Sequence, residues 1–421
     1  MKTVLFIFRE FNDIDHMIPI IYKSLQLNKY NVIVSCINPN FNIMKDFRLN
    51  YIKNKFGIDI KYIHQLHVPS IMHWVFLILV FKLTRIKFLN SFPLLSLISA
   101  KLKQIAFNSS IRKRLYNQTW VERLCVSHNV DAILVDFGSI EKFIYQEIKS
   151  AADLLSLPMI GVPHGYDTTA NDFWTNSEQV TQDSNRMEKS WGWVDNLIVA
   201  SAGVKTKYAN LGLKENKIKV IGSARFCKEW SPIYFSMLGD NPLMHNKTNH
   251  LKIVFFDHST MYRSNPDAIF DTLLEIDNLP FVDLVIKPHT RMNLSDYRFY
   301  DIGTISNEHS THLIASSDVV INYMSSIVID AYYFNKIFIY PDYFNQNIMR
   351  WELYNACWTV KSKSEMISAL TNIYNKASAT PYGTNEINHF LTQEIHGGTE
   401  NADVLSNYVE HISNVAMGQT Y

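Results

Sequence analysis

Residues 282–291 read VDLVIKPHTR, and residues 316–330 read SSDVVINYMSSIVID. Each stretch is an apolar run of about strand length that stops at a short polar cluster. Continuous hydrophobicity, without the alternation of a half-exposed strand, is typical of parallel strands that are buried on both faces. In an open sheet of such strands, ligands bind beyond the carboxyl ends. We therefore predict that both polar clusters face one binding crevice.

The same pattern recurs along the chain, where apolar runs rich in Val and Ile alternate with longer segments that suit helices. Helices between parallel strands imply right-handed βαβ units. A chain of 421 residues also exceeds what one hydrophobic core usually supports. We predict an α/β protein with two Rossmann-like domains facing each other across a cleft. The expected strands are 3–8, 32–37, 58–63, 132–136, 159–162, 197–200, 218–221, 251–256, 282–286, 319–322 and 337–340.

The predicted domain boundary lies within residues 223–250, where two prolines, a glycine and a polar cluster precede the next strand. We assign residues 1–222 to an N-terminal, acceptor-binding Rossmann-like domain. Residues 223–385 form the expected nucleotide-donor domain. Residues 386–421 are expected to be helical and to pack back across the domains.

Composition argues against several classes of protein. With 47% hydrophobic residues and charges mixed along most of its length, the chain is expected to be globular. A formal net charge of +1 supplies no overall field that would attract nucleic acid. The N-terminal MKTVLFIFRE reads as a first strand, because no small-residue cleavage site of a signal peptide follows it. The four cysteines lie far apart, with no CxxC and no His at metal-ligand spacing, which predicts buried thiols in a reducing compartment: Cys36, Cys125, Cys227 and Cys357.

Residues 61–121 have the most unusual composition, with nine Lys or Arg residues and no Asp or Glu. The apolar run within this segment, IMHWVFLILVF, has eleven residues, whereas a bilayer-spanning helix needs about 20. A basic, acid-free stretch with Trp and Phe is typical of a segment that lies on an anionic membrane surface. The alternative is a buried helix whose neighbouring cations form a solvated face or an acceptor-binding groove. The protein is expected to be cytoplasmic, and the first interpretation adds peripheral binding to the inner face of the plasma membrane.

The clusters after the two quoted strands contain groups that bind phosphate. Lys287 and His289 follow the first strand, and the imidazole of His289 can donate a hydrogen bond to a phosphate oxygen. Ser325 and Ser326 open a segment that suits a helix, whose free N–H groups and dipole favour an anion. Singly, Ser325 is as well explained as a helix N-cap and His289 as a loop histidine. Together they predict one phosphate site.

The same stretches carry a resemblance to a known family. KPHTR, followed by SSDVVINYMSSIVIDAYYFNKIFIYPDYF, resembles the donor half of GT-B transferases that use cytidine-nucleotide donors. These include the Kdo transferases, the bacterial polysialyltransferases and the CDP-glycerol glycerophosphotransferases. They share a Lys-x-His-Pro-like element and a Ser-Ser or Ser-Thr pair near the nucleotide phosphate. Here the first element reads Pro288-His289-Thr290, and the resemblance covers about 60 residues.

A third polar cluster, GVPHGYDTTANDFW, follows an apolar run in the first half of the chain. Gly165 allows a tight turn that leaves His164 exposed at the strand end. A similar His-Gly element is associated with the catalytic base in the glycerophosphotransferases, so the resemblance implies that role for His164. Imidazole suits it because its pKa lies near neutrality; a structural turn histidine is the alternative. Asp167 and Thr168 are expected to hold the acceptor or to cap the next helix.

Residues 221–230, IGSARFCKEW, bring charged groups to the predicted hinge. Ser223 and Arg225 are expected to contact the donor phosphate. Retaining transfer by double displacement needs a carboxylate nucleophile, and the resemblance to β-Kdo transferases implies one here. Glu229 is the candidate, although those enzymes use Asp. A hinge ion pair with Arg225 or Lys228 is the alternative.

Two further strand ends supply candidate catalytic groups. FFDHST ends the first strand of the second domain, and in GT-B folds this loop faces the donor phosphates, so His258 is expected to assist the leaving group. VDFGSIE ends a strand of the first domain and contributes Asp136 and Glu141 as reserve candidates for base or nucleophile.

Motifs for metal or dinucleotide chemistry are missing from the sequence. Asp13-x-Asp15 follows the first strand, but His16 and apolar residues come after it, unlike the metal-binding Asp-x-Asp of some sugar transferases. No Gly-x-Gly-x-x-Gly follows the first strand, which argues against a dehydrogenase. We predict that neither a metal nor a cofactor takes part.

Together these observations predict a metal-independent glycosyltransferase of capsule, O-antigen or lipopolysaccharide assembly. The expected donor is CMP-Kdo, and the expected acceptor is a lipid-linked or other oligosaccharide. Transfer from CDP-glycerol or CDP-ribitol into a teichoic-acid-like polymer is the alternative within the class. Two alternatives come from other classes: a non-catalytic glycan-binding or export component, and an epimerase that acts on a nucleotide sugar without any acceptor.

Overall fold

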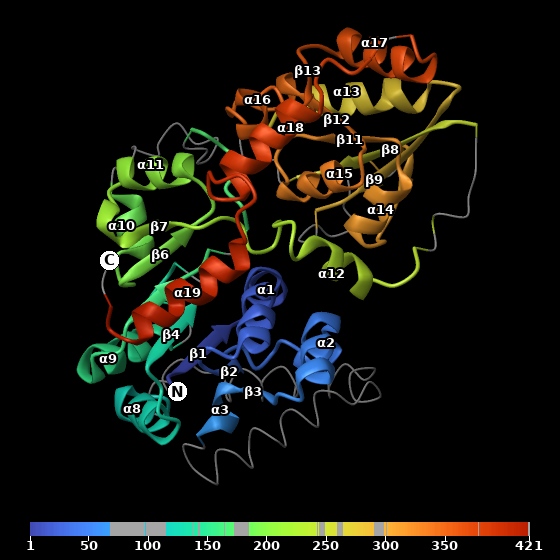
Figure 1. Ribbon diagram of the computed structural model, residues 1–421. Helices are drawn as coiled ribbons and strands as arrows, with labels where there is room; N and C mark the ends of the chain where they lie inside the picture. Colours follow the sequence, from blue (N-terminus) through green and yellow to red (C-terminus); the bar gives the residue numbers. More distant parts are fainter. Residues whose placement is uncertain are drawn as a thin grey trace.

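The chain folds around two parallel β-sheets, each covered by helices, which form two lobes (Figure 1). This architecture of two Rossmann-like α/β domains confirms the predicted fold class. The computed structural model describes residues 1–67, 97, 115–136, 138–141, 144–163, 165–171, 185–241, 243, 249–258, 264–289, 299, 301–377 and 379–419.

The first sheet has seven strands in the order β3-β2-β1-β4-β5-β6-β7, all of them parallel. Every residue of the central strands β1 and β4 is buried, as their continuous hydrophobicity predicts. The strand order reverses between β1 and β4, which opens a crevice at their carboxyl ends. The strands are β1 Thr3–Phe8, β2 Asn31–Cys36, β3 Ile60–Tyr62, β4 Ala132–Val135, β5 Met159–Gly161, β6 Asn196–Val199 and β7 Ile218–Val220. The helices of this lobe are α1 Phe11–Leu27, α2 Phe47–Phe56, α3 Ile63–Leu66, α8 Gln118–Ser127, α9 Tyr145–Leu155, α10 Arg186–Trp191 and α11 Ala202–Asn210, with 3-10 turns η1 Ile43–Lys45 and η2 Glu215–Lys217.

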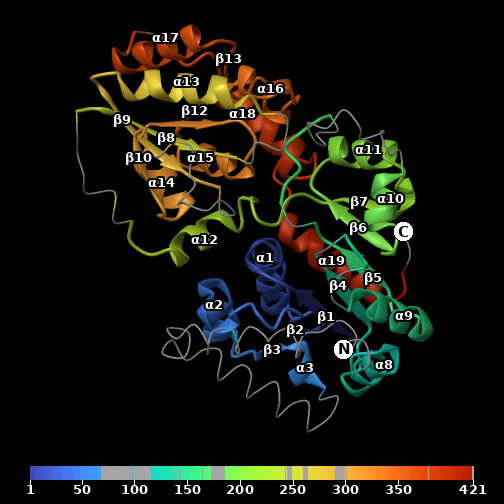
Figure 2. The same ribbon diagram turned by 180° about the vertical axis from the view of Figure 1, so that it is seen from behind.

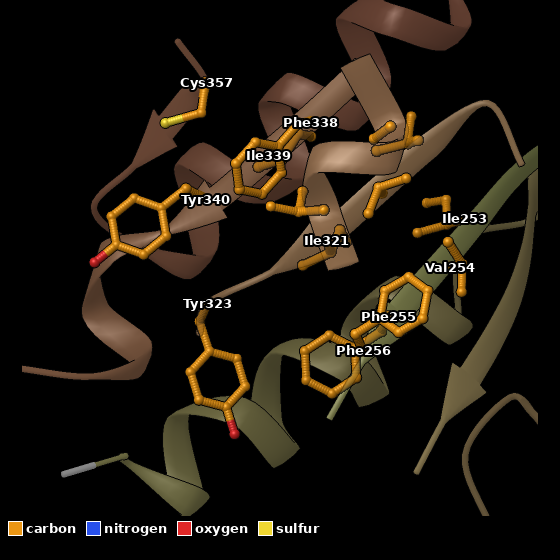
Figure 3. Close-up of a cluster of buried hydrophobic side chains, with 14 of the residues drawn as sticks. Ile253, Val254, Phe255, Phe256, Ile321, Tyr323, Phe338, Ile339, Tyr340 and Cys357 are labelled. Atoms are coloured by element: carbon orange, nitrogen blue, oxygen red, sulfur yellow. The ribbon is translucent and has the colours of Figure 1, made fainter. Parts of the chain in front are cut away.

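The second sheet has six parallel strands in the order β10-β9-β8-β11-β12-β13, and its strand order reverses between β8 and β11. Figure 3 shows side chains of β8, β11 and β12 gathered in the core of this lobe. The strands are β8 Leu251–Phe256, β9 Val282–Lys287, β10 Thr304–Ile305, β11 Val319–Asn322, β12 Ile337–Pro341 and β13 Trp358–Val360. The helices are α13 Pro266–Asp277, α14 Ser310–Ser316, α15 Ile329–Tyr333, α16 Arg350–Leu353, α17 Lys363–Tyr374 and α18 Thr384–Phe390, with 3-10 turns η5 Ser326–Val328 and η6 Asp342–Phe344.

Local sequence explains where helices begin and end. The carboxylate of Asp46 accepts hydrogen bonds from the backbone N–H groups of Arg48 and Leu49 and so caps α2. Gly57 ends the same helix at φ +69°, a left-handed conformation that suits glycine. Helix α2 packs beside α1, at the edge of the lobe that faces the second domain (Figure 1).

Three elements join the lobes. Helix α12 (Ser231–Met237) follows the first domain and lies between the two lobes in both views (Figures 1 and 2). After α18, the π-helical turn η7 (Leu391–Ile395) leads the chain back toward the first lobe. There α19 (Val404–Ala416) packs against α1, and its buried face joins the core of the first sheet. The chain therefore crosses between the lobes twice.

All eleven predicted strands are present, with ends within two residues of the prediction. Two strands were missed, β10 and β13, which have two and three residues and lie at opposite edges of the second sheet. Runs this short carry no readable periodicity. The four cysteines are free and buried, as predicted.

The predicted membrane-surface segment lies mainly outside the described residues, which include only 61–67, 97 and 115–121 of it. Among the described residues, no helix combines the length and the apolar character that crossing a bilayer requires.

Candidate functional site

A cavity of about 570 Å³ lies between the lobes, at the carboxyl ends of both sheets. Both reversals of strand order open toward it, which is where ligands bind in open α/β sheets. The cavity brings together ionisable and hydroxyl-bearing side chains from the two domains. Asp15, His16 and Asp167 line it from the first domain, and His258, Lys287, His289, Ser325 and Ser326 line it from the second.

A basic wall forms where β8 and β9 end. Lys287 is the last residue of β9, and the rings of His258 and His289 lie with their centroids 5.0 Å apart. Half-burial lowers the pKa of Lys287 by desolvation, an effect that nearby Glu308 opposes. The predicted grouping of Lys287 and His289 is therefore present, and His258 stands beside them.

The two serines lie in a rigid turn after β11. Buried Asn322 accepts hydrogen bonds from the N–H groups of Met324 and Ser325 (3.2 and 3.0 Å), and its amide donates to the carbonyl of Ser325. Ser325 caps the single 3-10 turn η5, which continues into α15. Because α15 has only five residues, its dipole is smaller than that of the helix expected here. Any anion would bind chiefly to the hydroxyls and the first N–H groups.

An acidic wall faces the cavity from α1. The carboxylate of Asp15 accepts hydrogen bonds from Arg48 Nη1 at 2.6 Å and from Arg225 Nε at 3.1 Å. Although desolvation opposes ionisation, the two guanidinium groups lower the pKa of Asp15 to about 2. Asp15 is therefore ionised at neutral pH. His16, the next residue on α1, is buried beside Phe226 and lines the same cavity.

The loop after β5 ties the two domains together. Asp167 forms an ion pair with buried Lys207 (2.8 Å), and the hydroxyl of Thr168 donates to the carbonyl of Met324 in the second domain (3.0 Å). Arg350 Nε donates to the carbonyl of Asp167 (3.0 Å), and Arg350 N donates to that of Thr168 (2.9 Å). Asp167 and Thr168 both line the cavity, but they also hold the interdomain connection. Their predicted part in acceptor binding stays a prediction.

The three predicted site residues of the hinge segment lie away from the main cavity. Arg225 is completely buried and engaged by Asp15 and Asp330, while Ser223 lines a small neighbouring cavity of about 30 Å³. Glu229 accepts a hydrogen bond from the N–H of Val404 (2.8 Å) at the start of α19. Glu229 thus lies beside the returning C-terminal helix, and the structure does not bring it together with His258 or His289.

Asp136 is buried below the crevice, in a cluster at the ends of β1 and β4. Arg9 Nη2 contacts Asp13 Oδ1 at 3.0 Å and Asp136 Oδ2 at 3.3 Å, and the hydroxyl of Tyr145 donates to Asp136. Desolvation and the neighbouring Asp13 raise the pKa of Asp136 well above its usual range. The reserve candidate Glu141 is exposed, and His164 lies outside the described residues.

Sequence reasoning missed the wall that α1 contributes. Asp15 and His16 were weighed only as a failed metal motif. They lie on α1, seven and eight residues past the end of β1, so a rule that covers only the residues directly after a strand does not reach them. The signal that the sequence offered was indirect: α1 is the helix that follows a strand ending at the crevice. Within the part of the chain that the structure describes, no group of three or more His, Cys, Asp or Glu is arranged to hold a metal ion.

No protein-family model and no curated protein sequence matches this chain. Solved structures of the same fold do match along its whole length. The S. aureus MnaA–UDP co-structure is 13% identical, with a TM-score of 0.55, and covers 100% of this chain and 98% of its own. The UDP-GlcNAc 2-epimerase from Neisseria meningitidis bound to UDP-GlcNAc is 12% identical, with a TM-score of 0.55, and the match covers 99% of this chain and 100% of the epimerase chain. Anabaena Alr3699/HepE in complex with UDP-glucose is 10% identical, with a TM-score of 0.54, and the match covers 98% of this chain and 100% of the HepE chain.

These similarities correct the functional prediction. They support a GT-B-like fold. These structures are UDP-GlcNAc 2-epimerases and complexes with UDP or UDP-sugars, and no transferase with a cytidine-nucleotide donor is among them. The expected CMP-Kdo glycosyltransferase of capsule or lipopolysaccharide assembly is therefore wrong, and so are the CMP- and CDP-activated partners. The error arose because a polar strand end followed by paired serines does not encode which base a bound nucleotide would carry.

Proposed function

We propose that this chain is an enzyme that acts on a UDP-activated sugar, as a sugar-nucleotide epimerase. The observation that carries the proposal is the cavity at the carboxyl ends of both sheets, where basic and hydroxyl groups of one domain face Asp15 and His16 of the other. Structures of the same fold that bind UDP, UDP-glucose and UDP-GlcNAc support a uridine nucleotide as the ligand class.

The second domain supplies groups suited to the diphosphate. Lys287 and His289 offer N–H donors, and Ser325 and Ser326 offer hydroxyls from a turn that Asn322 holds rigid. Hydrogen bonds from a charged donor to phosphate are shorter and stronger than neutral ones. A diphosphate held there would direct its sugar across the cavity toward α1.

Inverting a stereocentre beside the anomeric carbon by proton transfer requires a base to remove the C–H proton while the electron pair of that bond expels UDP from the anomeric carbon. A proton and UDP then add back across the resulting double bond, with the proton on the opposite face. Two histidines stand on different walls of the cavity, His16 on α1 and His258 after β8. Imidazole transfers protons efficiently at neutral pH because its ordinary pKa lies close to it. We assign His16 and His258 as the candidate acid–base pair. The reaction is an isomerisation, so it consumes no second substrate.

The test is to incubate the protein with UDP-GlcNAc or UDP-glucose in D2O, without any acceptor, and to follow the sugar by NMR. An epimerase produces a second sugar-nucleotide diastereomer that carries deuterium at the inverted carbon. Replacing His16 or His258 by Asn should lower the rate by about 10²- to 10⁴-fold. His250→Asn is the control, since His250 is an exposed histidine paired with Asp283. Absence of both nucleotide binding and conversion would overturn the proposal.

A further inference from the structure

Asp15 is an ionised carboxylate fixed at the edge of the cavity. Its Oδ1 accepts from Arg48 and its Oδ2 accepts from Arg225, so both oxygens are held in place. Arg48 and Arg225 are themselves buried, and the guanidinium of Arg225 stacks over the Tyr234 ring at 3.7 Å. If Asp15 swung away from the cavity, Arg48 and Arg225 would each lose one of two carboxylate partners in a buried setting, which is costly.

The same carboxylate still has capacity to bind a ligand. Two carboxylate oxygens offer about four acceptor sites, and the two arginines occupy one on each oxygen. The Asp15 side chain is 21% exposed, and it lines the cavity. The remaining acceptor sites suit sugar hydroxyls, which are donors.

The charge around Asp15 is not neutralised by its partners. Arg48 is also paired with Asp46 (2.6 Å), and Arg225 is also paired with Asp330 (3.1 Å). Three carboxylates therefore share two guanidinium groups, which leaves one excess negative charge when all three are ionised. A second carboxylate brought to this wall meets repulsion in a partly desolvated site, where the effective dielectric constant is below that of water.

We propose that Asp15 is a specificity-determining residue that admits nucleotide sugars with a neutral, hydroxyl-bearing sugar and rejects those with a carboxylate on the sugar. The inference rests on the proposed function and deepens it by naming the substrate class. The diphosphate lies against Lys287, His289, Ser325 and Ser326, and the sugar extends to the α1 wall.

The test compares the affinities of the protein for UDP, UDP-glucose and UDP-glucuronic acid by calorimetry. The last two ligands differ only in the oxidation of one sugar carbon to a carboxylate. We expect UDP-glucuronic acid to bind at least about tenfold more weakly than UDP-glucose. Equal affinities for the two sugars would overturn the specificity role of Asp15 and leave UDP-sugar binding intact. If none of the three ligands binds, the proposed function itself fails.

Two variants test the residue directly. Asp15→Asn keeps the shape and removes the charge, so the discrimination should fall below about threefold. Because that change can disturb the buried arginines, Asn12→Asp provides an independent route. Asn12 is exposed, lines the same cavity and lies three residues before Asp15 on α1, a spacing that places both on one face. Asn12→Asp should therefore widen the discrimination, and an unchanged ratio in this folded variant contradicts the proposal.

Discussion

The guanidinium of Arg225 contacts the carboxylate of Asp330, with 3.1 Å between Nη2 and Oδ2, and neither side chain is exposed to solvent. Arg225 follows the last strand of the first domain, and Asp330 lies on α15 of the second. The hydroxyl of Thr311 donates to the same carboxylate (2.8 Å). Arg225 also contacts Asp15 of α1, so these contacts link α1, the segment that follows β7, and α15.

Asp330→Ala should destabilise the protein by about 3 kcal/mol, because it leaves the buried charge of Arg225 with one carboxylate instead of two. Urea denaturation followed by circular dichroism measures the change. Glu410→Ala is the matched control, since it removes the exposed ion pair with Lys29 and should cost less than about 1 kcal/mol. A loss no larger than that of the control would show that the Arg225–Asp330 pair adds nothing to stability.

Glu394→Gln tests a second set of contacts between the domains, apart from those of Arg225 with Asp330. The buried carboxylate accepts hydrogen bonds from Tyr166 and Ser201 of the first domain and from Arg350 and Tyr354 of the second. A Gln amide replaces one acceptor oxygen with a donor, so the hydroxyls of Tyr166 and Ser201 would have to turn and accept from it, and Arg350 loses its counter-charge. We expect a loss of about 2 to 4 kcal/mol in the free energy of unfolding.

The control for this change is Glu386→Gln. The carboxylate of Glu386 accepts a single exposed hydrogen bond, from the N–H of Gly383. Substitution there should alter stability by less than about 1 kcal/mol. Similar unfolding midpoints for Glu394→Gln and the wild type would contradict the interpretation of Glu394 as an interdomain connection.

The sequence predicts those parts of the fold and site that depend on local pattern. The eleven strands follow from continuous hydrophobicity, and Lys287 and Ser325 reach the cavity because they lie at or close to the carboxyl ends of strands. The sequence predicted that Arg225 and Glu229 belong to the site, but the contacts that hold them in the structure are to residues far away in the sequence. Asp330 lies 105 residues from Arg225, and Val404 lies 175 residues from Glu229. No local pattern specifies such pairs.

Replacing both Ser325 and Ser326 by Ala should weaken UDP binding by about 1 to 3 kcal/mol, the range for losing hydrogen bonds to a charged group. Calorimetry of the folded double variant measures this loss. Ser364→Ala, at an exposed position of α17, is the control and should leave the affinity unchanged. Wild-type affinity in the double variant would remove the two hydroxyls from the proposed phosphate site.

The protein should lose stability in mild acid because of three partly buried histidines. Desolvation lowers the pKa of His309, His396 and His411 to about 4. In the unfolded chain these imidazoles take up protons near pH 6.5, whereas in the folded protein they stay neutral until about pH 4. The unfolded state therefore binds more protons between these values. The free energy of unfolding should fall as the pH falls from 6.5 to 4, by at most about 1.4 kcal/mol per pH unit for each histidine.

Urea denaturation at pH 7, 6 and 5 measures this slope, and His411→Gln isolates one contribution. His411 lies on α19 near Lys219, a cation that further disfavours its protonation. The variant cannot take up that proton on unfolding, so its stability should decline less steeply below pH 6.5 than that of the wild type. His250→Gln, at an exposed position, should reproduce the wild-type slope. Parallel curves for the wild type and His411→Gln would show that His411 ionises alike in the folded and unfolded states.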